Sequence, residues 1–353
     1  MAQYLSTDPL SWDFIVLYPA LCHWKNQQHQ LHRLRDATHP YWAFWFESHG
    51  LFEHWIEEFV TGDYRFGPMI CCRYKHDQVI VWSFRDRLFL KALLNLIKPT
   101  FPAIIHPHCV HLKGPSRGVQ QALDQLKRHL DSGQYEYFIR LDIKQYYASI
   151  DRRILTEQVK DCFDDPRVIH YLTQIIYHDI EDSRQYITPN RGIPLRSSLS
   201  PFFAALYLKP LDEAFSGRDG VFYVRFVDDV FMLFRSKRSY HRAKRRMYRI
   251  LRALKLQCSP NKTAQGQIVG KVLHFLGVEF QVERKTCDTE KPSQEAQNTL
   301  DTRLKTRLHS RTIHRRAKKT QSSLDLGAGL KVVQRGLRLS AAQVAPCFKH
   351  ICH

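Results

Sequence analysis

Short apolar runs alternate with helical stretches between residues 138 and 280 of the chain. Residues 137–143 form one such run, rich in the β-branched and aromatic side chains that favour β-strands. Residues 222–234 contain two more runs, separated by the acidic pair Asp228 and Asp229. Apolar strands around a short polar break predict a β-hairpin with the two acids at its tip. The alternation as a whole predicts an α+β layer in which helices pack on an antiparallel sheet.

The remaining pattern predicts helices with few strands. Aromatic residues, including five tryptophans, mark the first sixty residues as packed helices, with breaks at Pro19 and Pro40. A short strand at residues 79–82 and a helix at residues 86–98 follow. Residues 239–256 predict an amphipathic helix. Its apolar face carries Ala243, Met247, Ile250, Leu251 and Leu254.

Composition narrows the class of protein. The 353 residues are 44% hydrophobic and 25% charged, which is the balance of a folded protein with a large core. Lys and Arg number 53 against 34 Asp and Glu, and the resulting formal net charge of +19 implies a polyanionic partner. No stretch approaches the roughly 20 uninterrupted apolar residues of a spanning helix. The odd count of nine cysteines favours reduced thiols, so we expect a cytoplasmic protein with no membrane association.

Three carboxylates are the candidate chemistry. Asp142 lies at the end of the first apolar run, and a helix is expected after it, capped by Ser149 or Asp151. Acids in a solvated turn are the plain interpretation of the pair Asp228 and Asp229 taken alone. If the two strands are neighbours in one sheet, however, the three carboxylates converge, and their repulsion falls only when hard cations such as Mg²⁺ bind. Two such ions roughly 3.5 to 4 Å apart promote in-line displacement at phosphorus, which is phosphoryl transfer.

Five segments in order resemble the polymerase motifs of bacterial reverse transcriptases of the group II intron-like or retron-like kind. The segments are residues 140–151, 192–201, 226–229, 256–263 and 275–277. The resemblance spans roughly residues 62–280 and implies a right-hand polymerase of class α+β. We expect an N-terminal and fingers region at residues 1–135 and a palm, with an antiparallel sheet packed on helices, at residues 136–285. A short basic helical thumb would occupy residues 286–353.

The resemblance also implies roles for individual residues. Asp142 and Asp228 would hold both metal ions, Mg²⁺ or Mn²⁺. The carbonyl of Ile143 would assist one ion, and Asp229 would support the site less directly. Lys262 matches the family lysine that approaches the leaving pyrophosphate, and an ordinary surface lysine is the alternative.

Nucleotide binding is implied at three further positions. Tyr147 matches the position where an aromatic ring lies under the incoming sugar, so that a clash with a 2′-hydroxyl selects deoxynucleotides; core packing is the alternative. Gly192 and Pro194 would shape a passage close to the nascent base pair, and an ordinary turn is the alternative. Arg196 stands where relatives usually have a second glycine, and Asp77 where they often have a basic residue of the triphosphate clamp.

Primer and template contacts complete the expected polymerase. Phe275, Leu276 and Gly277 resemble the primer-gripping hairpin. Residues 235–255 hold ten Lys or Arg and no acid, and residues 301–353 hold twelve Lys or Arg against two Asp. We expect both basic segments to follow the phosphate backbone of the template-primer duplex, with a solvated surface as the alternative.

The sequence therefore predicts an RNA-directed DNA polymerase, a nucleotidyltransferase that extends a DNA or RNA primer on an RNA template with deoxynucleoside triphosphates. The resemblance suggests a mobile element, a retron-like unit with an associated non-coding RNA, or antiviral defence as its context. Two alternatives stay open: an RNA-binding protein with a degenerate polymerase fold, and a template-independent polymerase of a phage-defence system. The oligomeric state is open because the sequence contains no coiled-coil heptads.

Overall fold

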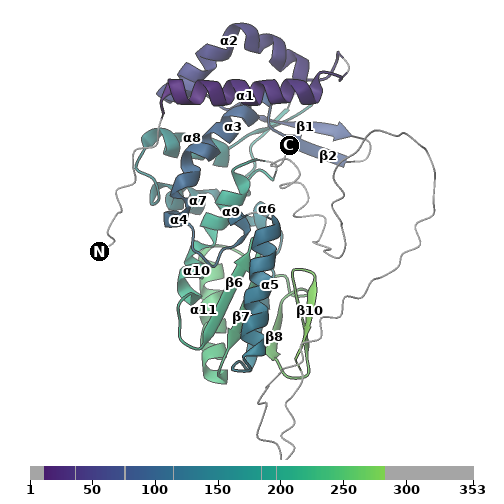
Figure 1. Ribbon diagram of the computed structural model, residues 1–353, viewed down its shortest axis with the longest axis vertical. Helices are drawn as coiled ribbons and strands as arrows, with labels where there is room; N and C mark the ends of the chain where they lie inside the picture. Colours follow the sequence, from purple (N-terminus) through teal and green to yellow (C-terminus); the bar gives the residue numbers. More distant parts are fainter. Residues whose placement is uncertain are drawn as a thin grey trace, which may run out of the picture.

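The computed structural model describes residues 12–35, 37–74, 77–113, 115–183, 185–195 and 197–282. The expected basic thumb at residues 286–353 and the residue Arg196 lie outside these ranges. The described part is elongated, with a mainly helical region at one end and a helix-covered sheet at the other (Figure 1). No helix in it is long and apolar enough to cross a membrane, and all of its cysteines are free thiols.

Two long helices, α1 (Phe14–His32) and α2 (Tyr41–Thr61), cap the helical end of the molecule (Figure 1). Pro40 precedes α2, as predicted, but the break expected at Pro19 is wrong because α1 runs through this residue. A proline in a helix removes the donor to the carbonyl four residues earlier, here that of Ile15. Ile15 is 77% exposed, so water can take the place of the missing donor.

A small mixed sheet lies beside these helices. Its strands have the order β2-β1-β4-β5, with the β1 and β4 pair parallel and the other two pairs antiparallel. The strands are β1 (Met69–Tyr74), β2 (Asp77–Val81), β4 (Ile180–Asp182) and β5 (Gln185–Ile187). Helix α3 (Phe84–Ile97) follows β2 and is capped by Ser83, whose side chain accepts a hydrogen bond from the Asp86 amide. The predicted strand and helix of this region are therefore confirmed within two residues.

Short helices connect the two ends of the molecule. They are η1 (Lys98–Thr100), α4 (Phe101–Ile104), η2 (His111–Lys113), α5 (Pro115–Asp131), α6 (Tyr146–Ser149), α7 (Arg152–Lys160), α8 (Pro166–Ile176), α9 (Ser200–Tyr207) and α10 (Lys209–Phe215). Asp151 caps α7 by accepting hydrogen bonds from the amides of Arg153 and Ile154. The helix start predicted after Asp151 is thus confirmed, because its carboxylate satisfies donors that have no partner inside the helix.

A four-stranded antiparallel sheet forms the palm, as expected. Its order is β6-β7-β3-β8, and every neighbouring pair is antiparallel. The strands are β3 (Tyr137–Leu141), β6 (Val221–Phe226), β7 (Asp229–Phe234) and β8 (Ala264–Gln267). A separate hairpin of β9 (Val272–Phe275) and β10 (Val278–Gln281) follows. The predicted hairpin around the acidic pair is confirmed as β6 and β7.

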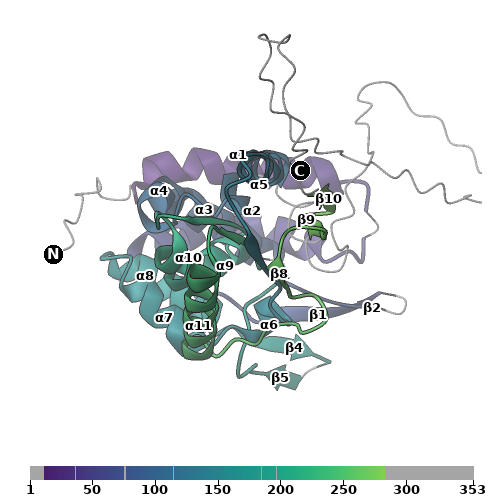
Figure 2. The same ribbon diagram turned by 90° about the horizontal axis from the view of Figure 1, so that it is seen from below.

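The two faces of the palm sheet carry different elements. Tyr137 and Phe234, which pair across β3 and β7, both contact the ring of Tyr240 on helix α11 (Lys237–Ala253). Side chains alternate along a strand, so Phe138 points to the other face, where it stacks on Phe231. Helices α10 and α11 cover the first face, whereas α5 covers part of the second (Figure 2).

Helix α11 has the predicted amphipathic pattern. Ser236 caps it, two residues before the expected start, and Tyr240, Ala243, Met247 and Leu251 are buried. These positions are spaced by three or four residues and therefore form one stripe, which faces the sheet. The charged side chains of the helix are left on its outer surface.

Candidate active site at the end of the palm sheet

The register of the palm sheet brings the predicted carboxylates together. Leu141 at the end of β3 pairs with Val230 in β7. One step further along the same register lie Asp142 and Asp229, on opposite strands and on the same face of the sheet. The condition that the sequence set, that the two apolar runs are neighbouring strands, is met.

Asp228 lies in a tight two-residue turn. Phe226 pairs directly with Asp229, so only Val227 and Asp228 connect β6 to β7. Val227 has φ +56°, a conformation that β-branched residues rarely adopt. Both of its main-chain groups are held: its amide donates to His111 Nδ1 at 3.3 Å, and its carbonyl accepts from Arg225 Nη1 at 3.0 Å. These bonds keep the turn, and with it the Asp228 backbone, in a defined position.

Arg225 is the centre of a buried ionic network behind this turn. Its side chain is completely buried and forms an ion pair with Asp212 of α10, with Nη2 2.5 Å from Oδ2 and Nε donating to Oδ1 at 2.7 Å. Nη2 also donates to the Ala205 carbonyl at 3.0 Å, and the Tyr223 hydroxyl donates to Asp212 at 2.6 Å. A buried ion pair tolerates its loss of hydration only when further hydrogen bonds satisfy it, as they do here.

His111 links the same turn to helix α9. Its Nε2 donates to the Pro201 carbonyl at 3.0 Å, so Nδ1 is the acceptor for the Val227 amide, and Nδ1 also lies 3.3 Å from Cys109 Sγ. Burial lowers the pKa of His111 to about 3 and raises that of the Cys109 thiol to about 12. Both side chains are therefore neutral at ordinary pH, and they position the turn rather than exchange protons.

The segment at residues 256–263 runs beside Asp142. The Asp142 carbonyl accepts a hydrogen bond from the Ser259 amide at 2.8 Å, and Ile143 forms an antiparallel bridge with Cys258. This arrangement brings Lys262 Nζ to 3.8 Å from Asp142 Oδ1. The structure therefore places the predicted lysine next to the predicted first aspartate.

The carboxylates strongly disfavour one another's charge. Burial raises the pKa of Asp228 to about 7, with further increases from Asp229 and Asp142. Burial likewise raises the pKa of Asp229 to about 6, with Asp142 adding to the shift and the nearby cations Arg140 and Lys262 opposing it. A cation bound between these groups would remove both penalties, because it favours the ionised form of every carboxylate around it.

The donors suit a hard divalent cation. In the part of the chain that the structure describes, no group of three or more His, Cys, Asp or Glu side chains is arranged as a metal site. The carboxylates of Asp142 and Asp228 and the main-chain carbonyl of Ile143 are all oxygen donors, which Mg²⁺ and Mn²⁺ prefer. Mutual repulsion between buried carboxylates is also the electrostatic state that a dication relieves, so these residues fit such an ion.

Gly192 and Tyr147 belong to one packed unit. Gly192 has φ +87°, and a Cβ on it would lie 3.1 Å from Ala148 Cα and 3.2 Å from the Tyr147 carbonyl oxygen. The Ile193 amide donates to that same carbonyl at 3.0 Å. Tyr147 is 8% exposed, and Pro194 is buried beside this strand-like segment. A glycine is required at 192 by both its φ and the close approach, so the expected passage is built against α6.

The neighbouring tyrosine has a structural role. The Tyr146 hydroxyl donates to the Ala204 carbonyl of α9 at 2.7 Å, and its side chain is fully buried. The sequence favoured Tyr146 over Tyr147 as the core residue, and its burial confirms that Tyr146 belongs to the core.

The segment that resembles the primer grip is a hairpin. Val278 pairs with Phe275, and the turn residues Leu276 and Gly277 have φ +48° and +79°, as a two-residue turn of this kind needs. The Phe275 ring packs against Phe231 with centroids 5.2 Å apart. The hairpin therefore lies against the face of the palm sheet that carries the carboxylates. Contact with a primer stays a prediction.

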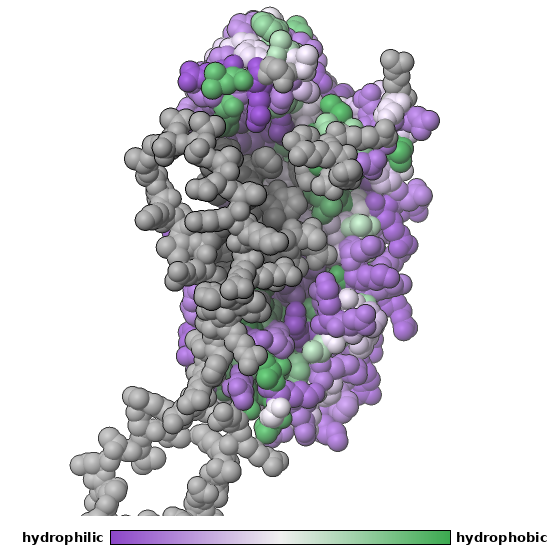
Figure 3. Space-filling model, turned by 90° about the vertical axis from the view of Figure 1, so that its right-hand side faces the viewer, coloured by the Kyte–Doolittle hydropathy of each residue, from purple (hydrophilic) through white to green (hydrophobic). Residues whose placement is uncertain are grey.

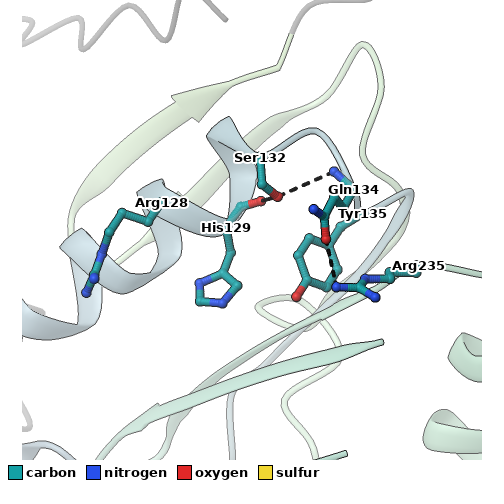
Figure 4. Close-up of a pocket in the computed structure, with 6 residues that line it drawn as sticks. All are labelled: Arg128, His129, Ser132, Gln134, Tyr135 and Arg235. Atoms are coloured by element: carbon teal, nitrogen blue, oxygen red, sulfur yellow. Dashed lines mark hydrogen bonds between the residues drawn. The ribbon is translucent and has the colours of Figure 1, made fainter. Parts of the chain in front are cut away.

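A surface pocket lies at the opposite end of the same sheet (Figure 4). Its volume is about 270 Å³, and Gln134 on its wall accepts a hydrogen bond from Arg235 at 2.7 Å. Its lining residues are Arg128, His129, Ser132, Gln134, Tyr135 and Arg235. These residues lie near the Tyr137 end of β3, whereas Asp142 follows the other end, about 17 Å away along the strand. The pocket is therefore separate from the carboxylates.

Sequence reasoning missed the supports of the site. Asp212, Arg225 and His111 position the turn, and Arg152 Nε donates to the Gly192 carbonyl at 3.0 Å. The available signal was Arg225 itself, a cation inside an otherwise apolar strand, which needs a buried partner. Of the two departures from the family, Asp77 begins β2 opposite Tyr74, and Arg196 lies outside the described residues.

Comparison with known proteins places this architecture in a family. The family described as reverse transcriptase (RNA-dependent DNA polymerase) matches residues 61–280, which is well over half of the chain. No curated protein matches the chain.

Three solved structures illustrate the similarity. The apo telomerase from Candida tropicalis is 13% identical, with a TM-score of 0.48, over 68% of this chain and 52% of that one. The telomerase from Candida albicans with a fragment of telomeric RNA is 13% identical, with a TM-score of 0.46, over 65% and 48%. A partial Cas6-RT-Cas1–Cas2 complex is 19% identical, with a TM-score of 0.40, over 68% and 41%. The chain thus spans about half the length of these proteins or less. On the match to residues 61–280, the chain belongs to the reverse transcriptase family.

Proposed function

We propose that the protein is an RNA-directed DNA polymerase that works by two-metal phosphoryl transfer at Asp142, Asp228 and Asp229. The observation that carries the proposal is the register of β3 and β7, which puts Asp142 opposite Asp229 beside the turn that holds Asp228. The raised pKa values of Asp228 and Asp229 support it, because they describe a buried anionic site in need of a cation.

Catalysis then rests mainly on positioning. Divalent ions bound at Asp142, Asp228 and the Ile143 carbonyl supply charge stabilisation to the attacking and leaving oxygens. The protein's own contribution is to align a primer 3′-hydroxyl with the α-phosphate of the incoming nucleotide, since phosphoryl transfer needs little covalent help. Lys262, close to Asp142, offsets the negative charge that develops on the pyrophosphate.

Substrate choice is assigned to the unit formed by Tyr147, Gly192 and Pro194. The nearly buried Tyr147 ring excludes a 2′-hydroxyl from the sugar position, so deoxynucleoside triphosphates are the substrates. Gly192 and Pro194 border the nascent base pair, and the turn of Phe275, Leu276 and Gly277 holds the primer.

The partners are an RNA template, a DNA or RNA primer and, in a retron-like unit, an associated non-coding RNA. The bacterial group II intron-like or retron-like subtype, a cytoplasmic location and a role in a mobile element or antiviral defence are part of the proposal. They rest on the motifs at residues 140–151, 192–201, 226–229, 256–263 and 275–277.

A second candidate is an RNA-binding protein that keeps the polymerase fold without efficient synthesis. The observation in its favour is the pair of departures, Arg196 in place of a small residue and Asp77 in place of a base. A third candidate keeps the chemistry without a template, as a polymerase of a phage-defence system. These alternatives differ from the proposal in what they make: nothing, or DNA unrelated to the template.

The test is primer extension on an RNA template with the double variant Asp228→Ala, Asp229→Ala. A matched control, Asp161→Ala with Asp164→Ala, removes two exposed carboxylates elsewhere. We expect template-dependent synthesis by the wild type and the control, and loss of at least a thousandfold in the Asp228 and Asp229 variant. Undiminished synthesis by that variant would refute the assignment, and RNA binding without any incorporation would favour the second candidate.

A further inference from the structure

Helix α11 and its flanks carry a dense positive surface. The stretch from Arg235 to Lys255 contains ten Lys or Arg and no acid. Nine of these side chains are exposed, and that of Lys244 is half-buried. We call the set the α11 basic face. It consists of Arg235, Lys237, Arg238, Arg242, Lys244, Arg245, Arg246, Arg249, Arg252 and Lys255.

Most of this charge is not neutralised by the protein. Arg235 lies 3.5 Å from Asp219, and Lys255 lies 2.6 Å from Asp151. In the ranges that the structure describes, the eight side chains between them form no ion pair with a carboxylate. Eight uncompensated cations on one short helix repel one another, so an anionic partner that binds them all lowers their energy.

The α11 basic face points away from the carboxylates. Tyr240 binds the sheet face marked by Tyr137 and Phe234, whereas Asp142 and Asp229 lie on the face marked by Phe138. Helices α5 and α11 lie on opposite sides of the strands in the view of Figure 2. A template-primer duplex seated over the carboxylates is therefore separated from α11 by the sheet. The expectation that this helix follows that duplex does not fit the geometry.

We propose that the α11 basic face is a second nucleic-acid site that grips a base-paired stem of RNA through its phosphates. The helix has 17 residues, about 25 Å in length, which matches several successive phosphates of a duplex. Exposed aromatic residues, which stack the bases of single strands, are nearly lacking on α11: within the helix only Tyr248 is an exposed large hydrophobic. The phosphate backbone of a duplex is the partner that such a surface fits.

Membrane binding is excluded by the same packing. An amphipathic helix that lies on a membrane must insert its apolar face, but Ala243, Met247 and Leu251 are buried against the sheet. Hydrophilic residues also predominate over the lower part of the molecule in Figure 3, with only small, separate hydrophobic patches. That the duplex is RNA rests on the proposed function, since an RNA template outside the active site is free to fold on itself.

The experiment compares two variants that each lose four positive charges. The α11 variant changes one exposed stripe: Arg238→Gln, Arg242→Gln, Arg245→Gln and Arg249→Gln. The control changes exposed cations elsewhere: Arg33→Gln, Arg35→Gln, Lys98→Gln and Lys160→Gln. The affinity of each full-length protein for a blunt-ended RNA hairpin, and for a DNA hairpin of the same sequence, is measured between 50 and 200 mM salt.

Each phosphate contact makes affinity fall about 3.5-fold over this range of salt, so four lost contacts leave the α11 variant roughly 100-fold less salt-sensitive than the wild type. The control variant should keep the wild-type slope. Equal slopes in all three proteins overturn the proposal. A loss confined to the DNA hairpin assigns the face to DNA and also overturns it.

Polymerase activity separates this proposal from the proposed function. On a primer-template too short to reach beyond the active site, the α11 variant should add nucleotides at the wild-type rate. The variant Asp228→Ala, Asp229→Ala should do the reverse, binding the hairpin normally without synthesis. An absence of synthesis in the wild type would remove the proposed function but leave hairpin binding at α11 measurable. Loss of short-template synthesis in the α11 variant, with its melting temperature unchanged, would contradict a separate site.

Discussion

At the scale of single residues, Asp228 links the acid-base state of the site to the stability of the fold. Its folded pKa is raised from 3.8 to about 7, chiefly by burial. A raised carboxyl pKa gives stability that is complete below the unfolded pKa and is lost as pH rises through the folded one. The wild type therefore loses about 1.4 kcal/mol per pH unit between roughly pH 4 and 7 through this group.

The variant Asp228→Asn removes this loss. In EDTA it should melt near the wild-type temperature at pH 4 and clearly above it at pH 8. Adding Mg²⁺ at pH 8 should stabilise the wild type and leave the variant nearly unchanged, because the ion offsets a charge that the variant does not have. Thermal unfolding followed by circular dichroism measures both effects. Parallel pH profiles of the two proteins would show that Asp228 is not the buried acid described here.

Arg225 tests whether the turn must be held for activity. Arg225→Met alone leaves Asp212 buried without its partner, which costs about 3 to 5 kcal/mol of unfolding free energy. The double variant Arg225→Met, Asp212→Leu removes both charges and should regain most of that stability. It still lacks the hydrogen bond to the Val227 carbonyl, so nucleotide addition should stay at least tenfold slow.

The measurement is a melting curve together with the single-turnover rate of nucleotide addition. A double variant that recovers both stability and rate would show that Arg225 serves the fold alone.

At the scale of elements, the contact between the segment at Gly192 and helix α6 is the joint that the account depends on. Gly192→Ala combines a strained φ with a Cβ contact at 3.1 Å to Ala148 Cα. Gly217→Ala is the matched control, because Gly217 has φ +67° but an added Cβ would meet nothing within 4 Å. Both should lose about 1 kcal/mol from strain, whereas Gly192→Ala should lose a further 1 to 3 kcal/mol from overpacking.

The two glycine variants also differ in function. Only Gly192→Ala displaces Tyr147, so only it should change the preference for deoxynucleotides over ribonucleotides. Urea unfolding and a competition between the two kinds of nucleotide measure these effects. Equal losses of stability and unchanged preference in both variants would argue against the joint.

Individual elements were more readily predicted from the sequence than the contacts between them. The hairpin of β6 and β7 and helix α11 follow from local apolar spacing, which reflects burial on one face. The break at Pro19 was wrong because a proline near a helix start costs one hydrogen bond, which water replaces at an exposed site. Local propensity does not see that compensation.

The supports of the site could not be predicted for a physical reason. Asp212 and Arg225 are 13 residues apart and His111 is more distant still, and they meet only because the sheet stacks α10 and η2 behind one turn. Adjacent acids such as Asp228 and Asp229 give a visible pattern in the chain. A buried ion pair between two elements gives none, since each partner taken alone resembles a surface charge.

At the scale of the whole molecule, the palm sheet separates two chemistries. One face bears the carboxylates and the hairpin with Phe275, and the other bears α10 and the α11 basic face. We infer that the enzyme holds the reacting end of its template on the first face and a folded part of the same RNA on the second. The formal net charge of +19 suits both tasks, because each binds a polyanion.

The central claim is that the buried carboxylates at the end of the palm sheet hold divalent ions. Electron paramagnetic resonance can count Mn²⁺ bound to the protein in the presence of primer-template and a non-reactive deoxynucleotide analogue. The account predicts two tightly bound ions in the wild type. It predicts their loss in the variant Asp142→Asn, Asp228→Asn, with an unchanged melting temperature at pH 5. Equal Mn²⁺ binding by the two proteins would contradict it.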